Sequence, residues 1–283
     1  MNREAFEENN STMANVGMFI MDPQMDFFPG GSCAIPAADN VALRIADVLA
    51  AHSSRVMNVY VSLETHHRMH ISNPHYWQSG ETGEAPPSWL VINSADLENQ
   101  VWRPRQTEGA ALQKAIKYTE QLELDGKPAL MLWPEHCLLG TKGGAVVKVV
   151  NDAVQDWAGT HPDTPIEYII KGNNSTTEMH SVFEAEVPDP EDPSTCFNLT
   201  LLERLSAHDF VLVCGYSLSH SIDRTLRHLL PKLPAEKRSR VVLLSDCCCS
   251  IPGHEAAGER LVQFAAESGA TVTKASELSE LLK

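Results

Sequence analysis

Short apolar runs that alternate with helical patterns constrain the fold of this chain more than any other feature. Six of these runs have the pattern of buried strands, and a shorter candidate follows them, at residues 16–21, 56–63, 129–133, 166–170, 210–214, 241–245 and 270–273. Helical periodicity marks the segments 40–52, 144–157, 199–205, 222–230, 255–268 and 277–282. Continuous apolar strands separated by helices are typical of a mainly parallel sheet with both faces covered. The sequence therefore predicts a three-layer α/β/α fold with a mainly parallel sheet of about six strands.

Residues 74–128 do not follow this alternation. The stretch contains several prolines, a helical piece at 110–122, and the tryptophans Trp77, Trp89 and Trp102. Long insertions of this kind form lids or assembly surfaces, and large aromatic side chains in a polar stretch need burial. We expect a single domain over residues 1–283, with a polar N-terminal tail at 1–13. The insertion at about 74–128 is expected to cover the site or to build a subunit interface.

Charge and hydropathy exclude several classes of protein. The formal net charge is −15, which disfavours binding to nucleic acids and anionic membrane surfaces, because both are polyanions. No apolar run approaches the roughly 20 residues that span a bilayer. The polar segment before Met13 lacks the basic and apolar parts of a signal peptide. These features predict a cytoplasmic protein without nucleic-acid or membrane partners.

The cysteines do not form the pattern of a disulfide framework. There are 7, an odd number, and three of them are contiguous at 247–249. Several lie in apolar runs, which favours a reducing compartment. A metal or redox role for the triplet is conceivable, but side chains alternate along a strand, so neighbouring thiols point to opposite faces. We therefore expect small buried core residues.

Asp22 and Lys171 each stand at the end of a predicted strand. A carboxylate in this position can serve as a general base, while its purely structural role is to cap the following turn. A lysine that directly follows a buried strand is either solvated or needs a partner for its charge. Asp22 on a neighbouring strand would be such a partner. Because ligands bind at the carboxyl ends of parallel strands, both residues are candidates for a site.

A second group of polar residues has the composition of a metal site. Glu64 and His66 follow one strand with Glu-x-His spacing, and His136 follows another. In an extended segment this spacing places the carboxylate and the imidazole on the same side. With His136 as third ligand they could hold a divalent ion and leave positions open for water or substrate. A histidine-rich surface loop without an ion is the other interpretation. Nearby, Trp133 could stack on a flat ring or pack in the core.

The segment 211–225 predicts a sharp turn between a strand and a helix. An apolar strand runs into a turn at Gly215, and a helix opens at 219–221. Such an elbow aims one side chain and several free backbone N–H groups at a single point. The side chain at that point is Ser221.

Together these motifs resemble the isochorismatase-like cysteine hydrolases, most closely the nicotinamidase branch, over about residues 16–75 and 129–265. The run Asp-Pro-Gln-Met-Asp-Phe-Phe-Pro-Gly-Gly, which begins at Asp22, matches the motif that carries the family's general base. The resemblance implies that Lys171 is the catalytic lysine and that Glu64, His66 and His136 bind a divalent ion, with zinc expected. It also implies a substrate pocket that contains Phe27, Trp133 and Tyr216.

Two positions depart from the family's pattern. Glu64 stands where the family has aspartate, which keeps the carboxylate on a longer arm. Ser221 stands at the position of the nucleophilic cysteine, through either an engineered replacement or a natural loss. The Tyr216–Ser217 bond falls where the family has a non-proline cis peptide, so the N–H groups of Ser217 and Ser221 would form the oxyanion hole. A free thiol has a pKa near 8.5, but a serine hydroxyl is far more basic, so weak turnover is expected.

The resemblance implies a metal-dependent amidohydrolase that acts on a small carboxamide, nicotinamide or a similar molecule, as in NAD salvage. A homo-oligomer is expected. Two alternatives remain open. One is a non-catalytic descendant that binds a small molecule or a partner, which the serine at position 221 would favour. The other is a vinyl-ether hydrolase of the isochorismatase type, which needs no nucleophile and does not rely on the metal site.

Overall fold

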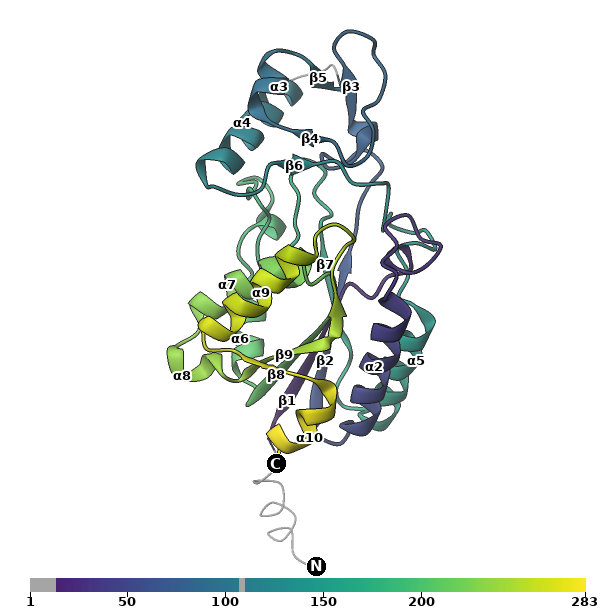
Figure 1. Cartoon of the computed structure of the whole chain (residues 1–283), viewed down its shortest axis with the longest axis vertical. Helices are drawn as coiled ribbons and strands as arrows, with labels where there is room; N and C mark the ends of the chain where they lie inside the picture. Colours follow the sequence, from purple (N-terminus) through teal and green to yellow (C-terminus); the bar gives the residue numbers. More distant parts are fainter. Residues whose placement is uncertain (1–13, 107–109) are drawn as a thin grey trace, which may run out of the picture.

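A six-stranded parallel sheet forms the centre of the computed structural model, which describes residues 14–106 and 110–283 (Figure 1). Its strands are β1 (Val16–Met21), β2 (Val56–Glu64), β7 (Glu167–Lys171), β8 (Phe210–Tyr216), β9 (Val241–Cys249) and β10 (Thr271–Thr273). The spatial order is β10-β9-β8-β1-β2-β7, and every neighbouring pair is parallel. The predicted fold class is therefore confirmed. The tail predicted at 1–13 lies outside the described residues.

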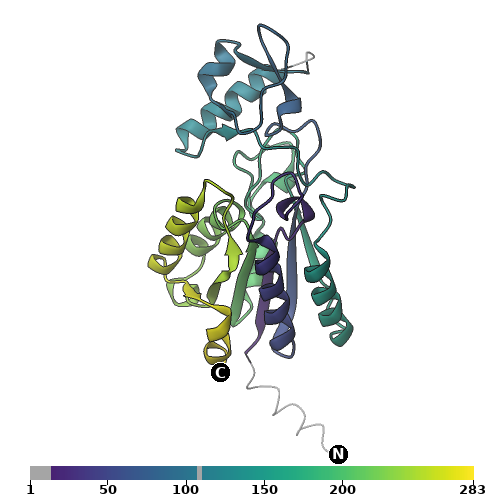
Figure 2. The ribbon, with the colours of Figure 1, turned by 45° about the vertical axis from the view of Figure 1, so that its right-hand side comes forward.

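Helices cover both faces of this sheet, as Figures 1 and 2 show. One face carries α2 (Ala38–Ala51) and α5 (Lys148–Thr160). The opposite face carries α6 (Leu199–Ser206), α7 (Ser221–Lys232) and α9 (Glu255–Glu267). Shorter elements are α8 (Ala235–Arg238), α10 (Leu278–Leu281), and the 3₁₀ turns η1 (Met25–Phe27), η2 (Pro74–Tyr76), η3 (Pro193–Thr195) and η4 (Ala275–Glu277).

Apolar spacing explains why these helices pack against the sheet. The buried residues of α2 recur every three or four positions, at Ala38, Val41, Ala42, Ile45, Val48 and Leu49. Those of α7 do the same, at Ser221, Ile222, Thr225, Leu226, Leu229 and Leu230. This period places one face of each helix on the sheet. Consequently the first turn of α7, with Ser221, lies at the carboxyl end of β8.

The insertion forms a small structure with an apolar cluster of its own. We call residues 74–131 the cap; it lies beyond the carboxyl edge of the sheet in Figure 1. It contains β3 (Trp77–Ser79), β4 (Val91–Ile92), β5 (Trp102–Pro104), β6 (Leu130–Met131), α3 (Ser94–Glu98) and α4 (Ala111–Leu124). Its cluster includes Ile71, Trp77, Leu97, Tyr118 and Leu130. Trp77 is fully buried in this cluster, Trp102 is partly buried and packs against the cluster, and Trp89 remains 46% exposed.

The prediction of a sheet strand at 129–133 was wrong. Only Leu130 and Met131 are extended, and β6 pairs antiparallel with β4 inside the cap. The run is apolar because Leu130 and Leu132 are buried in the apolar cluster of the insertion, not in the core of the central sheet. The boundary of the insertion therefore includes β6.

Two further sequence predictions can be compared with the structure. All 7 cysteines are free, and Cys247, Cys248 and Cys249 are buried in β9, as expected of core residues. Within the described part of the chain, no helix combines the length and the apolar character that crossing a membrane requires.

Candidate active site

The carboxyl ends of β1, β2 and β7 bring Asp22, Glu64 and Lys171 together. In the parallel register Glu64 is the direct partner of Lys171, while Asp22 follows the last residue of β1. Lys171 Nζ lies 3.0 Å from Asp22 Oδ2 and 3.8 Å from Glu64 Oε2. All three side chains are buried. The predicted pairing of Asp22 with Lys171 is thus present in the structure.

Asp22 is held in an unusual backbone conformation and a polar environment. Its φ of 46° is in the left-handed region, which is uncommon for residues other than glycine. Ser62 Oγ donates to Asp22 Oδ1 over 2.6 Å. Among the described groups Oδ2 accepts no directed hydrogen bond, although it forms the ion pair with Lys171. Oδ2 therefore keeps a lone pair that could accept a proton.

Burial and neighbouring charges set the protonation of this pair. Burial raises the pKa of Asp22 above its ordinary value, although the Lys171 ammonium acts in the opposite direction. Burial also lowers the pKa of Lys171, but the carboxylates of Asp22 and Glu64 outweigh that effect and hold it above the ordinary value. Asp22 is consequently a stronger base than a solvated carboxylate, beside a lysine that stays charged.

Ser221 occupies the elbow between β8 and α7. It is the first residue of α7, and Lys171 Nζ lies 3.5 Å from its Oγ. The preceding Tyr216–Ser217 peptide bond is cis, as the resemblance implied. Gly215 has a φ of +118°, and a Cβ there would lie 2.2 Å from Met21 O. A glycine at this position therefore lets the end of β8 lie against β1.

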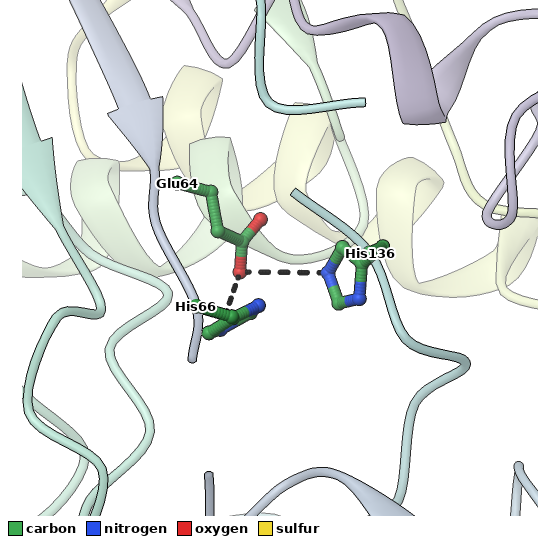
Figure 3. Close-up of side chains that lie close together, drawn as sticks. All are labelled: Glu64, His66 and His136. Carbon is green, nitrogen blue, oxygen red and sulfur yellow. Dashed lines mark ion pairs between the residues drawn. The ribbon is translucent and has the colours of Figure 1, made fainter. Parts of the chain in front are cut away.

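Glu64, His66 and His136 converge as predicted (Figure 3). Glu64 Oε1 lies 3.5 Å from His66 Nε2 and 3.8 Å from His136 Nε2. His136 Nδ1 lies 2.8 Å from Pro134 O, an interaction that directs Nε2 toward the carboxylate. The three donor atoms all lie within 4.8 Å of one another. Two imidazoles and a carboxylate in this arrangement fit a zinc-like ion.

When no ion is bound, Glu64 is expected to be a carboxylate and His136 a charged imidazole. Burial raises the pKa of Glu64, but Lys171 and the two imidazoles outweigh it and hold the pKa well below the usual range. Burial lowers the pKa of His136, whereas Cys33 and Glu64 raise it, and the net pKa is above the ordinary value. An ion bound at this site would displace the proton of His136.

A narrow cavity of about 10 Å³ lies between Ser221 and the metal donors Glu64 and His136. It is lined by Phe27, Cys33, Glu64, Trp133, His136, His180, Ser217, His220, Ser221 and Ile251. Phe27 and Trp133, which the resemblance assigns to a substrate pocket, are both among these residues. Tyr216 does not line this cavity; it is buried in the core, and its hydroxyl donates to Ala38 O. Its ring packs against Phe28 instead.

A wider cleft of about 350 Å³ adjoins the cavity and shares Trp133, His180 and His220 with it. The cleft lies between residues of α4 and β6 in the cap and residues of α7 and α9 in the main body. The cap thus forms one wall of the approach to the site. Burial lowers the pKa of His220 in this region to about 2, so its imidazole is neutral near pH 7.

Three residues near the site were not found by sequence reasoning. Cys33 and His180 line the narrow cavity, and Glu178 lies 3.4 Å from His66 Nε2. Glu178 and His180 repeat the Glu-x-His spacing of Glu64 and His66, which was a usable signal. Cys33 carried no comparable signal, because its apolar context is typical of a core cysteine.

Known proteins resemble this chain in structure but not detectably in sequence. No protein-family model and no curated protein sequence matches it. Its structure has the fold of the isochorismatase-like hydrolases, and 69 chains of solved structures match it. A nicotinamidase/pyrazinamidase from Acinetobacter baumanii is 18% identical, with a TM-score of 0.62, over 94% of this chain and 99% of that one.

Two other solved structures show the same likeness. The yeast nicotinamidase Pnc1p, solved with the inhibitor nicotinaldehyde, is 19% identical with a TM-score of 0.60, over 92% of this chain and 99% of that one. The pyrazinamidase of Pyrococcus horikoshii, solved with zinc, is 17% identical with a TM-score of 0.54, over the same shares of 92% and 99%. At these identities the comparison establishes the fold.

Proposed function

We propose that this chain is a metal-dependent amidohydrolase of the nicotinamidase type whose nucleophile position is occupied by Ser221. One observation carries the proposal. Lys171 joins Asp22 to both Ser221 and Glu64 at the carboxyl edge of the sheet, and Ser221 lines the same narrow cavity as the metal donors Glu64 and His136. The names of the similar structures, nicotinamidases and pyrazinamidases, support a small aromatic carboxamide as substrate.

In this mechanism Asp22 is the general base. Oδ2 would take the proton of residue 221 while Oγ attacks the carbonyl carbon of the amide. Asp22 would then return that proton to the leaving nitrogen, so that ammonia departs and an acyl-enzyme remains. Water, deprotonated by Asp22, would release the acid. Lys171 would keep the site electrically balanced, because its charge persists while Asp22 gains and loses the proton.

The backbone after β8 would stabilise the negative charge of the tetrahedral intermediate. The N–H groups of Ser217 and Ser221 have no hydrogen-bond acceptor in residues 14–106 and 110–283. Both residues line the cavity. Two free N–H groups, one just after β8 and one at the first residue of α7, are suited to an oxyanion hole.

Glu64, His66 and His136 would hold the divalent ion, with zinc expected. When bound, the ion supplies a Lewis acid that can anchor a ring nitrogen or a carbonyl oxygen of a substrate. The rings of Phe27 and His136 pack edge to face, with centroids 5.7 Å apart. Phe27 and Trp133 would thus bound the substrate beside the metal donors.

A serine at position 221 limits the turnover of this arrangement. The alkoxide of serine is inaccessible to a carboxylate base, whereas a thiolate forms near neutral pH. Weakening one member of a nucleophilic group can cost on the order of 10⁴-fold or more in rate. The same residue favours a second candidate function, a protein that binds a small carboxamide or its acid without turnover.

The Ser221→Cys variant tests this proposal. The rate of ammonia release from nicotinamide and pyrazinamide should rise by several orders of magnitude, on the order of 10⁴-fold or more. Ser219→Cys is a matched control, since it places a thiol two residues away and should gain nothing. Asp22→Ala added to Ser221→Cys should remove the gain.

Calorimetry with nicotinamide and nicotinate separates the two candidate functions. If Ser221→Cys hydrolyses no carboxamide of a small panel while a ligand still binds, the binding protein replaces the amidohydrolase. If nothing binds and nothing is hydrolysed, both proposals fail.

A further inference from the structure

A second group of possible metal ligands lies against His66. It consists of His66, His70 and Glu178, which are all buried, and the donor atoms lie within 4.8 Å of one another. His66 Nε2 is 3.4 Å from Glu178 Oε1, and the rings of His66 and His70 have centroids 4.5 Å apart. His70 follows β2 at a distance of six residues, and Glu178 follows β7 by seven.

Two polar atoms of this group have no partner. In the part of the chain that the structure describes, His70 Nε2 and Glu178 Oε2 are buried and accept or donate no hydrogen bond. His70 is 0% exposed and Glu178 is 3% exposed. Leaving such groups unpaired costs free energy, and for a carboxylate the cost is larger than for a neutral group. An additional partner between the two side chains would remove that cost.

The surroundings fix both side chains in a suitable orientation. His70 Nδ1 accepts from the Ser72 N–H over 3.3 Å and lies 2.8 Å from Ser72 Oγ. Binding of an ion at Nε2 requires the other tautomer, in which Nδ1–H donates to Ser72 Oγ and the longer bond from the Ser72 N–H is given up. Glu178 Oε1 accepts from Met179 N–H over 2.9 Å, which restrains the carboxylate while Oε2 stays unpaired. Metal-binding histidines are held in the same way through their second ring nitrogen.

We propose that His66, His70 and Glu178 form a second position for a zinc-like divalent ion. Two imidazole nitrogens and one carboxylate oxygen are the donors that such an ion prefers. His66 is common to this position and to the one with Glu64 and His136. Its Nε2 has a single lone pair, and it lies at nearly equal distances from Glu64 and Glu178, 3.5 and 3.4 Å. The chain therefore binds one ion in two alternative positions.

The two positions differ in their connection to the proposed catalytic pair. Glu64 contacts Lys171 Nζ over 3.8 Å, so an ion on Glu64 is linked to the Asp22–Lys171 pair. An ion in the second position would leave Glu64 free to balance Lys171. The inference concerns metal binding alone and does not depend on amide hydrolysis.

Zinc binding by the full-length apo-protein tests the second position. The wild-type chain should bind one zinc ion in equilibrium dialysis. His136→Ala, which removes only the first position, should still bind one. Adding Glu178→Gln or His70→Ala to His136→Ala should weaken binding by at least about 100-fold, because a direct ligand matters more than an outer contact. His75→Ala in the same background is the matched control, since this exposed histidine should have no effect.

Cobalt(II) provides a readout that does not rely on affinity. Its visible absorption should differ between the wild type and His136→Ala, because the ligands change while the ion stays bound. Circular dichroism checks that each variant is folded, and Glu178→Gln covers the case in which His70→Ala does not fold.

Three results would overturn the inference: no zinc bound by the wild type, none bound by His136→Ala, or full binding by both double variants. Failure of the amidohydrolase proposal would leave zinc binding by His136→Ala unchanged, so the two failures are distinguishable.

Discussion

Lys171 Nζ lies 3.0 Å from Asp22 Oδ2, and both side chains are fully buried at the carboxyl ends of β7 and β1. Two charges taken out of water stabilise a fold only while each has its partner. The same ion pair that Asp22 and Lys171 form for the proposed reaction is therefore also needed for the stability of the protein.

Removing either charge of the pair should destabilise the protein, and removing both should cost less than the sum. Asp22→Asn and Lys171→Met should each lower the free energy of unfolding by about 3–5 kcal/mol. Lys171→Met should be the more destabilising of the two, since it leaves the buried carboxylates of Asp22 and Glu64 without their positively charged partner. Urea unfolding of the two single variants and the double variant measures the coupling. Additive effects would contradict a direct interaction.

His66→Ala should reduce zinc binding more than any other single change among the donors. His66 belongs to both sets of donors, so its loss leaves each with two ligands. The zinc content of purified protein, measured by mass spectrometry, should fall to near background. The neighbouring exposed His67→Ala is the control and should retain zinc. Equal zinc content in His66→Ala and the wild type would rule out both positions.

Trp133→Ala should widen the range of amides that the Ser221→Cys enzyme accepts. Trp133 lines both the narrow cavity and the wider cleft, so its removal joins the two spaces. We expect kcat/KM for nicotinamide to fall by about 10- to 200-fold, while bulkier aromatic amides lose less. Trp89→Ala is the comparison, because Trp89 contacts the Trp133 edge from an exposed position. An unchanged order of substrates would refute this role.

His208 should contribute a loss of stability as pH drops below the ordinary pKa of histidine. Burial lowers the pKa of His208, whose Nε2 faces Tyr60 Oη at 2.9 Å and whose Nδ1 faces Asn15 Oδ1 at 2.9 Å. The unfolded chain then binds more protons below about pH 6.5, so unfolding becomes easier as pH falls. One such group changes the free energy of unfolding by at most about 1.4 kcal/mol per pH unit.

Urea midpoints of the wild type and His208→Gln between about pH 5 and 7 check this contribution. The slope with pH should be shallower in His208→Gln than in the wild type. A parallel loss of stability in the two proteins would exclude His208 as the cause.

Much of the fold was predictable because strand and helix patterns are local. The strand at 16–21 was predicted with the bounds that β1 has, and most other sheet strands differ by only a few residues. The strand of the central sheet predicted at 129–133 was wrong, because an apolar run can be buried in a small cap as well as in a central sheet. Periodicity does not reveal which apolar cluster a strand joins.

The site was predictable where its residues stand at strand ends. Asp22, Glu64, His66, Lys171 and Ser221 converge because parallel strands finish at the same edge. His136 follows β6 of the cap instead, so its place beside Glu64 did not come from a strand of this sheet. Tyr216 was misplaced for a related reason: alternation along β8 does not tell which face becomes core. Its hydroxyl instead donates to Ala38 O.

The sequence by itself determined the order of the elements, the kind of sheet, and the residue types at its carboxyl edge, because each depends on neighbours along the chain. Only the tertiary structure decided that Glu178 and His70 stand beside His66, and that the cap lines the approach to the cavity. These relationships join segments more than a hundred residues apart, as between His66 and Glu178. Distances of that kind are set by how the loops after β2 and β7 pack, which no local pattern specifies.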